Sequence, residues 1–137
     1  MKIHSLICCL VVIVVAFSSC SDDESDGAWD DNIQLSVKSV SFTSAADSVI
    51  ITTKGDWWWV TDVTVGEDVF YMPDGVDVES TDYAIRQNSF VVERRGKNAL
   101  FVKVDALVSS QPRLITIGLE AADYFDRISI SQSPPKE

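Results

Sequence analysis

Hydrophobic and polar residues alternate with a period of two along several segments in the C-terminal part of the chain. Residues 100–104, 113–119 and 125–131 each place Ile, Leu or Val on one side, with a different and less uniformly apolar set of residues on the other. This alternation predicts β-strands that bury one face in an antiparallel sheet. The side chains expected in the core are Leu100, Val102, Val104, Ile115, Ile117, Leu119, Ile128 and Ile130.

From residue 33 onward, runs rich in Val, Ile, Thr and aromatic residues are separated by turn residues, and no segment keeps a helical period. This spacing predicts an all-β, Ig-like antiparallel β-sandwich of about seven strands plus an inserted hairpin. The hairpin would join residues 70–72 to 76–78 through Pro73-Asp74-Gly75, because Pro fixes φ and Gly tolerates positive φ. We expect strands at residues 35–42, 48–53, 57–63, 69–72, 76–78, 90–94, 100–105, 113–119 and 125–131.

A different pattern occupies the N-terminus, where Lys2 precedes an unbroken apolar run that ends in Ser18-Ser19-Cys20. The run is shorter than the about 20 residues of a membrane-spanning helix, and it fits the apolar core of a secretory signal. With its small residues before the cysteine, the segment resembles a bacterial lipoprotein signal, in which the cysteine is acylated. We therefore expect residues 1–19 to be a signal peptide and Cys20 a lipid anchor. Ordinary secretion and a membrane helix are the alternatives.

An acidic segment follows the cysteine. It contains Asp22, Asp23, Glu24, Asp26, Asp30 and Asp31 and no basic residue. Such a segment has too few apolar side chains to form a core, so we expect residues 20–32 to be a solvated tether. Cysteine followed by Ser-Asp-Asp-Glu resembles the surface-export tether of Bacteroidetes lipoproteins. The resemblance implies an outer-membrane lipoprotein exposed on the cell surface, with the periplasmic face of that membrane as the alternative.

Cleavage before Cys20 would also remove Cys8, Cys9 and His4, which is the only histidine. Disulfides, zinc sites built on His or Cys, and Ser-His-Asp or Cys-His catalysis are then excluded. We expect no enzyme activity, no cofactor and no metal, and catalysis by a carboxylate pair is the enzymatic alternative. The net charge of −10 disfavours nucleic acid and anionic lipid as partners.

Three short motifs within the expected β domain are similar to one family. They are Gly55-Asp56-Trp57, Arg113-Leu114-Ile115-Thr116-Ile117 and Ile128-Ser129-Ile130-Ser131-Gln132. Over residues 33–133 the chain resembles the BACON domain, an Ig-like module associated with Bacteroidetes. The resemblance implies a sandwich of about seven strands and the binding of carbohydrate. The chain departs from the family in Ala121-Ala122, where the second residue is often Gly, and in an acidic insertion before Phe90.

The run Trp57-Trp58-Trp59 contains the aromatic surface that a sugar-binding site needs. In an extended strand Trp57 and Trp59 share one face with the apolar Val63 and Val65, and Trp58 lies on the other. We therefore expect Trp57 and Trp59 in the core and Trp58 exposed, and packing of all three indoles is the alternative. Exposed aromatic rings and acidic groups suit the faces and hydroxyls of sugars. The predicted ligand-binding residues are Trp58, Asp62, Tyr71 and Tyr83.

Two clusters of charge leave alternatives open. Residues 62–82 contain many acidic residues and no Lys or Arg, which predicts a solvated loop. A calcium site is the alternative there, because oxygen ligands suit that ion. The basic cluster of Arg94, Arg95 and Lys97 is expected to be solvated at the end of a hairpin, with ligand binding as the alternative.

Two main functional hypotheses follow. The first is a lipid-anchored surface accessory module that binds carbohydrate within a polysaccharide-capture system. Its partners would be a glycan, the outer membrane through the lipid, and outer-membrane proteins. The second is a structural or protein-interaction β-sandwich lipoprotein without affinity for glycans. An aromatic ring that stands out of the surface would favour the first hypothesis.

Overall fold

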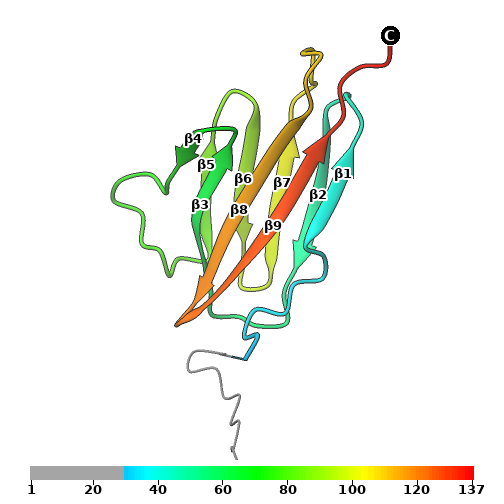
Figure 1. Cartoon of the computed structure of the whole chain (residues 1–137). Coiled ribbons are helices and arrows are strands. Elements are labelled where there is room, and N and C mark those ends of the chain that lie inside the picture. Colours follow the sequence, from blue (N-terminus) through cyan, green and yellow to red (C-terminus); the bar gives the residue numbers. More distant parts are fainter. Residues whose placement is uncertain (1–29) are drawn as a thin grey trace, which may run out of the picture.

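The structure describes residues 30–137 as two β-sheets packed face to face, and this part of the chain contains no helix (Figure 1). It is a computed structural model. The fold confirms the predicted all-β sandwich, and it has nine strands. The strands are β1 (Ser39–Phe42), β2 (Asp47–Thr52), β3 (Trp59–Val65), β4 (Asp68–Phe70), β5 (Asp82–Arg86), β6 (Phe90–Arg95), β7 (Ala99–Val104), β8 (Arg113–Ala121) and β9 (Tyr124–Gln132).

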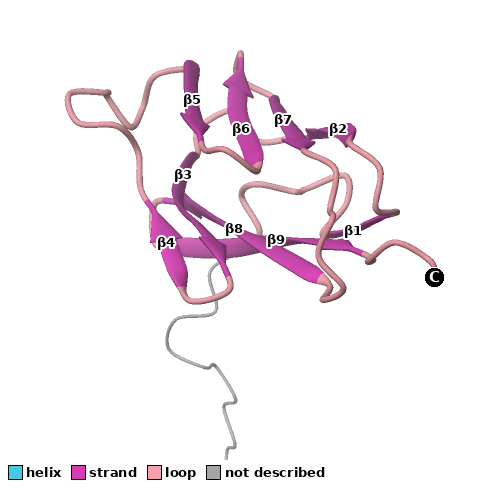
Figure 2. Cartoon of the chain, turned by 90° about the horizontal axis from the view of Figure 1, so that it is seen from above, coloured by secondary structure: helices cyan, strands magenta, loops and turns pink. Residues whose placement is uncertain are grey.

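The two layers are separated clearly in Figure 2. One sheet has five strands in the order β1-β9-β8-β3-β4, and the other has four strands in the order β2-β7-β6-β5. All neighbouring strands are antiparallel except β1 and β9, which are parallel. The long hairpin of β8 and β9 forms the middle of the five-stranded sheet and turns at Ala122-Asp123.

The core lies between the sheets and is built mainly from aliphatic side chains. The predicted alternation on β7, β8 and β9 is confirmed, because every Ile, Leu and Val expected to point inward is buried. Their polar neighbours in sequence point to solvent, as expected for sheets that each bury one face.

The region after β3 differs from the prediction. Gly66 has a φ of 61°, which suits glycine, and it allows a tight turn that folds β4 back onto β3. Residues 76–78 form no strand, so the inserted hairpin predicted there is wrong. A loop over residues 71–81 instead carries the chain to the other sheet, where β5 begins. β5 was not predicted, because its short run of apolar residues stands between charged residues.

The predicted first strand, residues 35–42, is divided between the two sheets. Leu35 forms an isolated bridge with Thr53, and Ser36 N–H donates to the Thr52 carbonyl at 2.8 Å, beside the four-stranded sheet. The chain then crosses to the five-stranded sheet, where β1 pairs with β9. The fully buried Ile33 precedes this crossing.

A buried amide closes the end of the sandwich at which β9 finishes. Gln132 Nε2 donates to the carbonyl oxygens of Ala45 and Asp105, each at 3.1 Å, and its Oε1 accepts from Arg113 Nη1 at 3.0 Å. These bonds join the β1–β2 and β7–β8 loops to the last strand. They also satisfy a polar side chain that is shielded from water.

The predicted signal peptide, Cys20 and most of the predicted tether lie outside the described residues. Residues 30–137 include no helix long and apolar enough to cross a membrane.

Candidate functional site

A bulge in β3 reverses the expected faces of the three tryptophans. The pairing of β3 with β8 shifts between Val60 and Asp62, so one extra residue separates the two halves of the strand. Val63 is buried beyond the bulge, and Val60 and Trp58 are buried before it. Trp58 is 1% exposed, whereas Trp57 is 53% exposed. The prediction that Trp58 faces solvent is therefore wrong, because the bulge displaces the alternation by one residue.

Trp58 is held in a buried polar corner, which we define as Thr53, Trp58, Tyr83 and Arg94. The indole Nε1–H donates to Thr53 Oγ1 at 3.0 Å. The Arg94 guanidinium lies 3.9 Å from the centroid of the Trp58 ring, and its Nη1 donates to the Trp58 carbonyl. Such a cation over an indole face is favourable, and the contact also buries the ring. Trp58 is thus a structural residue.

Arg94 is only 2% exposed, so the prediction of a solvated hairpin end is wrong for this residue. Its remaining donors reach the carbonyls of Asp56 at 3.3 Å, Gly96 at 3.2 Å and Lys97 at 3.2 Å. A buried guanidinium needs such partners for its donors, and here backbone carbonyls supply them. Arg94 therefore ties the segment before β3 to the β6–β7 turn.

The motif Gly55-Asp56-Trp57 lies next to the buried polar corner. A Cβ on Gly55 would lie 1.9 Å from the backbone oxygen of Asn32, so only glycine fits. Asn98, which lies in the β6–β7 turn, donates from its Nδ2 to the Gly55 carbonyl at 2.9 Å. The glycine thus serves the close approach of two backbone segments.

Tyr83, a predicted ligand-binding residue, belongs to the corner and is buried. Its phenol oxygen accepts the Val60 backbone N–H at 2.9 Å. Burial raises the pKa of Tyr83, while the bond from Val60 and the charge of Arg94 oppose that rise. Tyr83 is therefore not presented at the surface as expected, because its hydroxyl is bonded to the β3 backbone from the other sheet.

The other two predicted ligand-binding residues lie apart from the corner. Asp62 is on the outer face of the five-stranded sheet, where it accepts from Thr61 Oγ1 at 2.8 Å and Thr64 Oγ1 at 3.1 Å. Its carboxylate covers Gly118, since a Cβ there would lie 2.4 Å from Asp62 Oδ1. Tyr71 is 69% exposed in the loop after β4. The four predicted residues therefore do not assemble into one site.

The structure instead assembles a row of side chains on the outer face of the five-stranded sheet. Trp59 pairs with Glu120 across β3 and β8, and Glu120 pairs with Phe125 across β8 and β9. Paired residues point to the same face, so these three lie side by side. Trp57 extends the row, since its ring meets the Trp59 ring edge-on with centroids 5.4 Å apart. We call Trp57, Trp59, Glu120 and Phe125 the aromatic platform.

Hydrogen bonds fix the orientation of the platform. Trp59 Nε1–H donates to Glu120 Oε2 at 3.1 Å, which holds the half-buried indole against the sheet. Phe125 is 66% exposed, and the residues on either side of it point inward. These two neighbours are bonded to each other, because Tyr124 Oη donates to the Asp126 carboxylate at 3.1 Å. Lys38 Nζ lies 2.7 Å from the same carboxylate. The bond to Asp126 also raises the pKa of Lys38.

Comparisons with known proteins support the fold only. No family model matches the chain, and no curated protein matches it. The chain is similar to a solved structure described as the NMR structure of a protein from Bacteroides thetaiotaomicron. The two share 17% sequence identity, and the TM-score is 0.59 over 77% of this chain and 89% of that one. At this identity the likeness shows a shared sandwich fold.

The acidic stretch forms no metal centre in the described part of the chain. Among residues 30–137, no three His, Cys, Asp or Glu side chains lie together in an arrangement that could hold a metal ion. The calcium alternative considered for residues 62–82 is therefore not supported by the geometry. Asp77 instead accepts the Glu79 backbone N–H at 2.9 Å within a local turn.

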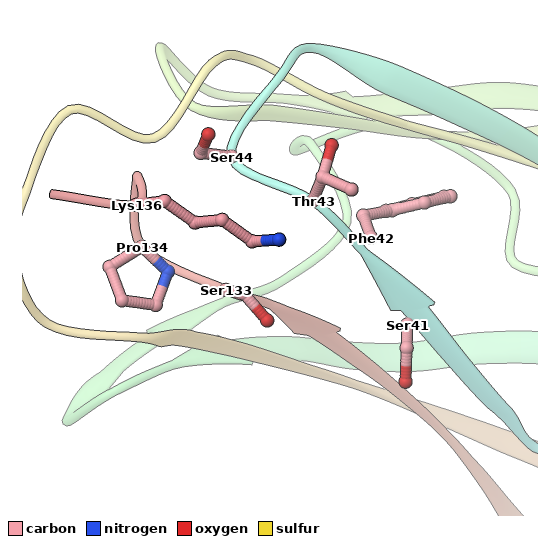
Figure 3. Close-up of a pocket in the computed structure, with 7 residues that line it drawn as sticks. All are labelled: Ser41, Phe42, Thr43, Ser44, Ser133, Pro134 and Lys136. Atoms are coloured by element: carbon pink, nitrogen blue, oxygen red, sulfur yellow. The ribbon is translucent and has the colours of Figure 1, made fainter.

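A hollow of about 500 Å³ lies where β1 and β9 finish, which is the opposite end of the five-stranded sheet from the platform. The Phe42 ring and the Pro134 ring line it, and the Lys136 side chain extends into it (Figure 3). Ser41, Thr43, Ser44 and Ser133 complete the lining. The hollow contains no carboxylate and none of the predicted ligand-binding residues.

The sequence held a signal for the platform that the prediction did not use. Ile128 and Ile130 define the inward face of β9, and the same alternation places Phe125 outward with Arg127 and Ser129. An aromatic residue on a polar strand face is a candidate contact residue. Glu120 could be placed on the outer face of β8 in the same way. Only their proximity to Trp57 and Trp59 needed the structure.

Proposed function

We propose that the aromatic platform binds carbohydrate, and that the protein is a surface accessory module held to the outer membrane by a lipid on Cys20. The observation that supports this proposal is the row formed by the exposed Trp57 and Phe125 and the half-buried Trp59 beside one carboxylate. Exposed aromatic rings give a large contact area at low entropic cost, which suits the C–H faces of sugar rings.

Glu120 provides the polar contact that such a site needs. One of its carboxylate oxygens accepts the Trp59 indole N–H, and a carboxylate has further lone pairs to accept sugar hydroxyls. Because the same bond fixes the indole, little side-chain freedom remains to be lost on binding. The platform would thus contact a sugar through both its ring faces and its hydroxyls.

The residues of the chain favour binding over catalysis. The only histidine and all cysteines lie within residues 1–20, outside the proposed domain. Glu120 is the one carboxylate of the platform, so the row supplies no pair of carboxyl groups for glycoside hydrolysis. We therefore propose a non-catalytic role.

A glycan array tests the proposal directly. The mature chain with Cys20→Ser would be applied, together with Trp57→Ala and Phe125→Ala variants. We expect binding to at least one glycan class and a loss of about tenfold in affinity for Trp57→Ala, by analogy with nucleic-acid bases, whose stacking on one aromatic ring contributes roughly 1–3 kcal/mol. Ile50→Ala is the control, because Ile50 is an exposed residue on the other sheet. If the wild-type chain binds no glycan, the proposal is wrong.

The lipid anchor requires a separate experiment. We expect metabolic labelling with a radioactive fatty acid to mark the wild-type chain and not a Cys20→Ala variant. Protease treatment of intact cells would then show whether the domain is on the cell surface. An unlabelled wild-type chain would contradict the anchor and leave the platform unaffected.

The alternative function, a protein-interaction module, is favoured by the outer face of the four-stranded sheet. There the exposed Ile50 pairs with Phe101, whose ring lies 3.8 Å from the Arg95 guanidinium. Glu93 bridges Arg86 at 3.3 Å and Arg95 at 3.2 Å. If Ile50→Asp abolished co-purification with an outer-membrane protein while glycan binding was absent, this function would replace the first.

A further inference from the structure

The outer face of the five-stranded sheet continues beyond the aromatic platform as a field of small hydroxyl side chains. Thr64 pairs with Thr116, Thr116 with Ser129, and Ser129 with Ser39, which gives one row across four strands. A second row joins Leu114, Ser131 and Ser41. Because paired residues share a face, both rows lie on the same surface as the platform.

One further row of paired residues separates the platform from these rows. Gly118 lies between Asp62 on β3 and Arg127 on β9, and it adds no side chain to the surface. Apart from Leu114, which is 56% exposed, the side chains of the two rows are small. A ligand that is bound on the platform and extends along β8 and β9 would therefore meet Arg127 and Leu114 as the large side chains on its path.

We infer that the platform and the two hydroxyl rows form one binding surface for an extended, uncharged polysaccharide chain that lies along β8 and β9. This inference rests on the proposed function and adds the class and length of the ligand. Glu120 in the platform and Leu114 in the far row lie about 20 Å apart along β8, because each residue of a strand adds about 3.4 Å. The surface is therefore longer than one or two sugar rings need.

The charges on this surface favour a neutral ligand. Asp62 and Glu120 are acidic, Arg127 is the basic residue paired beside them, and the whole chain has a net charge of −10. A polyanionic chain would be repelled by this field. Hydroxyl groups of the ligand and of the two rows can both donate and accept, which suits a neutral sugar polymer.

Affinity gel electrophoresis tests the inference with the mature chain carrying Cys20→Ser. Native gels would contain starch, xylan, mannan or a mixed-linkage β-glucan as neutral polymers, and polygalacturonate as the acidic one. Ser131→Lys places a long charged side chain in the far row, and Ser48→Lys makes the same change on the outer face of β2. Both serines are exposed, so both variants are expected to fold.

We expect retardation of the wild-type chain in a neutral polymer and at least fivefold weaker retardation of Ser131→Lys in the same gel. Ser48→Lys is expected to match the wild type, and a disaccharide of that polymer is expected to bind Ser131→Lys and wild type equally.

Retardation by polygalacturonate alone, or equal retardation of Ser131→Lys and wild type, overturns the inference. If Ser131→Lys and wild type are retarded equally but Trp57→Ala loses binding, the proposed function is still supported. If no gel retards the wild type and no glycan binds, both are wrong.

Discussion

The buried polar corner and the aromatic platform share one run of three tryptophans, yet they differ in burial and in hydrogen bonding. Trp58 is surrounded by Thr53, Tyr83 and Arg94, and its indole N–H and carbonyl are both bonded inside the protein. Trp57 shows half of its surface to solvent and meets only the edge of a neighbouring ring. The corner therefore stabilises the fold, whereas the platform leaves its aromatic surface free for a ligand.

The difference shows that side-chain type alone does not decide the role of a residue in this chain. One extra residue in the bulge of β3 moves Trp58 inward and leaves Trp57 and Trp59 outside. Changes in the corner should lower the free energy of unfolding, and changes in the platform should lower ligand binding. The following experiments separate the two regions, beginning with the largest expected effect on stability.

Trp58→Ala should have the largest effect. Removal of a fully buried indole leaves a cavity and should lower the free energy of unfolding by about 3–5 kcal/mol. Urea denaturation followed by circular dichroism would measure this change. An unchanged denaturation midpoint would show that Trp58 does not belong to the core and would remove the contrast between the regions.

Arg94→Met should come next, with a loss of about 3 kcal/mol. Methionine preserves much of the volume but leaves the Trp58 and Asp56 carbonyls without their donor. Arg94→Lys is the matched control, because it keeps the charge but cannot reach all the carbonyls at once. We expect an intermediate loss for lysine. Equal stability of wild type and Arg94→Met would show that the buried guanidinium does not hold the corner together.

Tyr83→Phe should have a smaller effect of about 1 kcal/mol, and this effect should depend on pH. The pKa of Tyr83 is raised in the folded protein above its ordinary value of 10.0. The stabilisation is therefore complete below pH 10 and is lost as the pH rises through the folded pKa, because the unfolded chain releases its proton first. The stability difference between wild type and Tyr83→Phe should shrink between pH 9 and pH 11 (roughly one unit either side of the ordinary tyrosine value). A constant difference across this interval would contradict the burial of the phenol.

Trp57→Ala should have the smallest effect on stability, within about 0.5 kcal/mol, because the side chain is largely exposed. The same variant is expected to lose most of its glycan binding. Thermal unfolding and glycan binding would be measured on one preparation. A strong loss of stability would place Trp57 with the corner and would make any loss of binding uninformative.

Much of the fold could be predicted from local sequence patterns. The β7, β8 and β9 alternations follow directly from the pleat of a strand, so their inward residues could be assigned from the sequence. The bulge in β3 could not, because its position depends on the pairing with β8 and on the space left by Gly118. The pairing of β4 with β3 depended in the same way on the turn at Gly66.

The candidate site was harder to predict because it combines residues from distant strands. Tyr83 and Arg94 carry polar groups that the sequence suggests are solvated, yet their partners are backbone groups of the β3 segment. Trp59, Glu120 and Phe125 come together only through the registers of three strands. Periodicity can assign a face to a residue in a regular strand, but it cannot locate a bulge or assign a neighbour across the sheet.

The parallel pairing of β1 with β9 has a mechanical consequence. The chain reaches β1 after bonding to the edge of β2, and it then runs beside β9 from the Ser39–Ser129 pair to the Phe42–Gln132 pair. A pull on the segment before β1 acts along the strand, so it loads these hydrogen bonds in shear and all at once. If the proposed tether and the proposed polymer binding both hold, drag on the polymer would be shared among these hydrogen bonds.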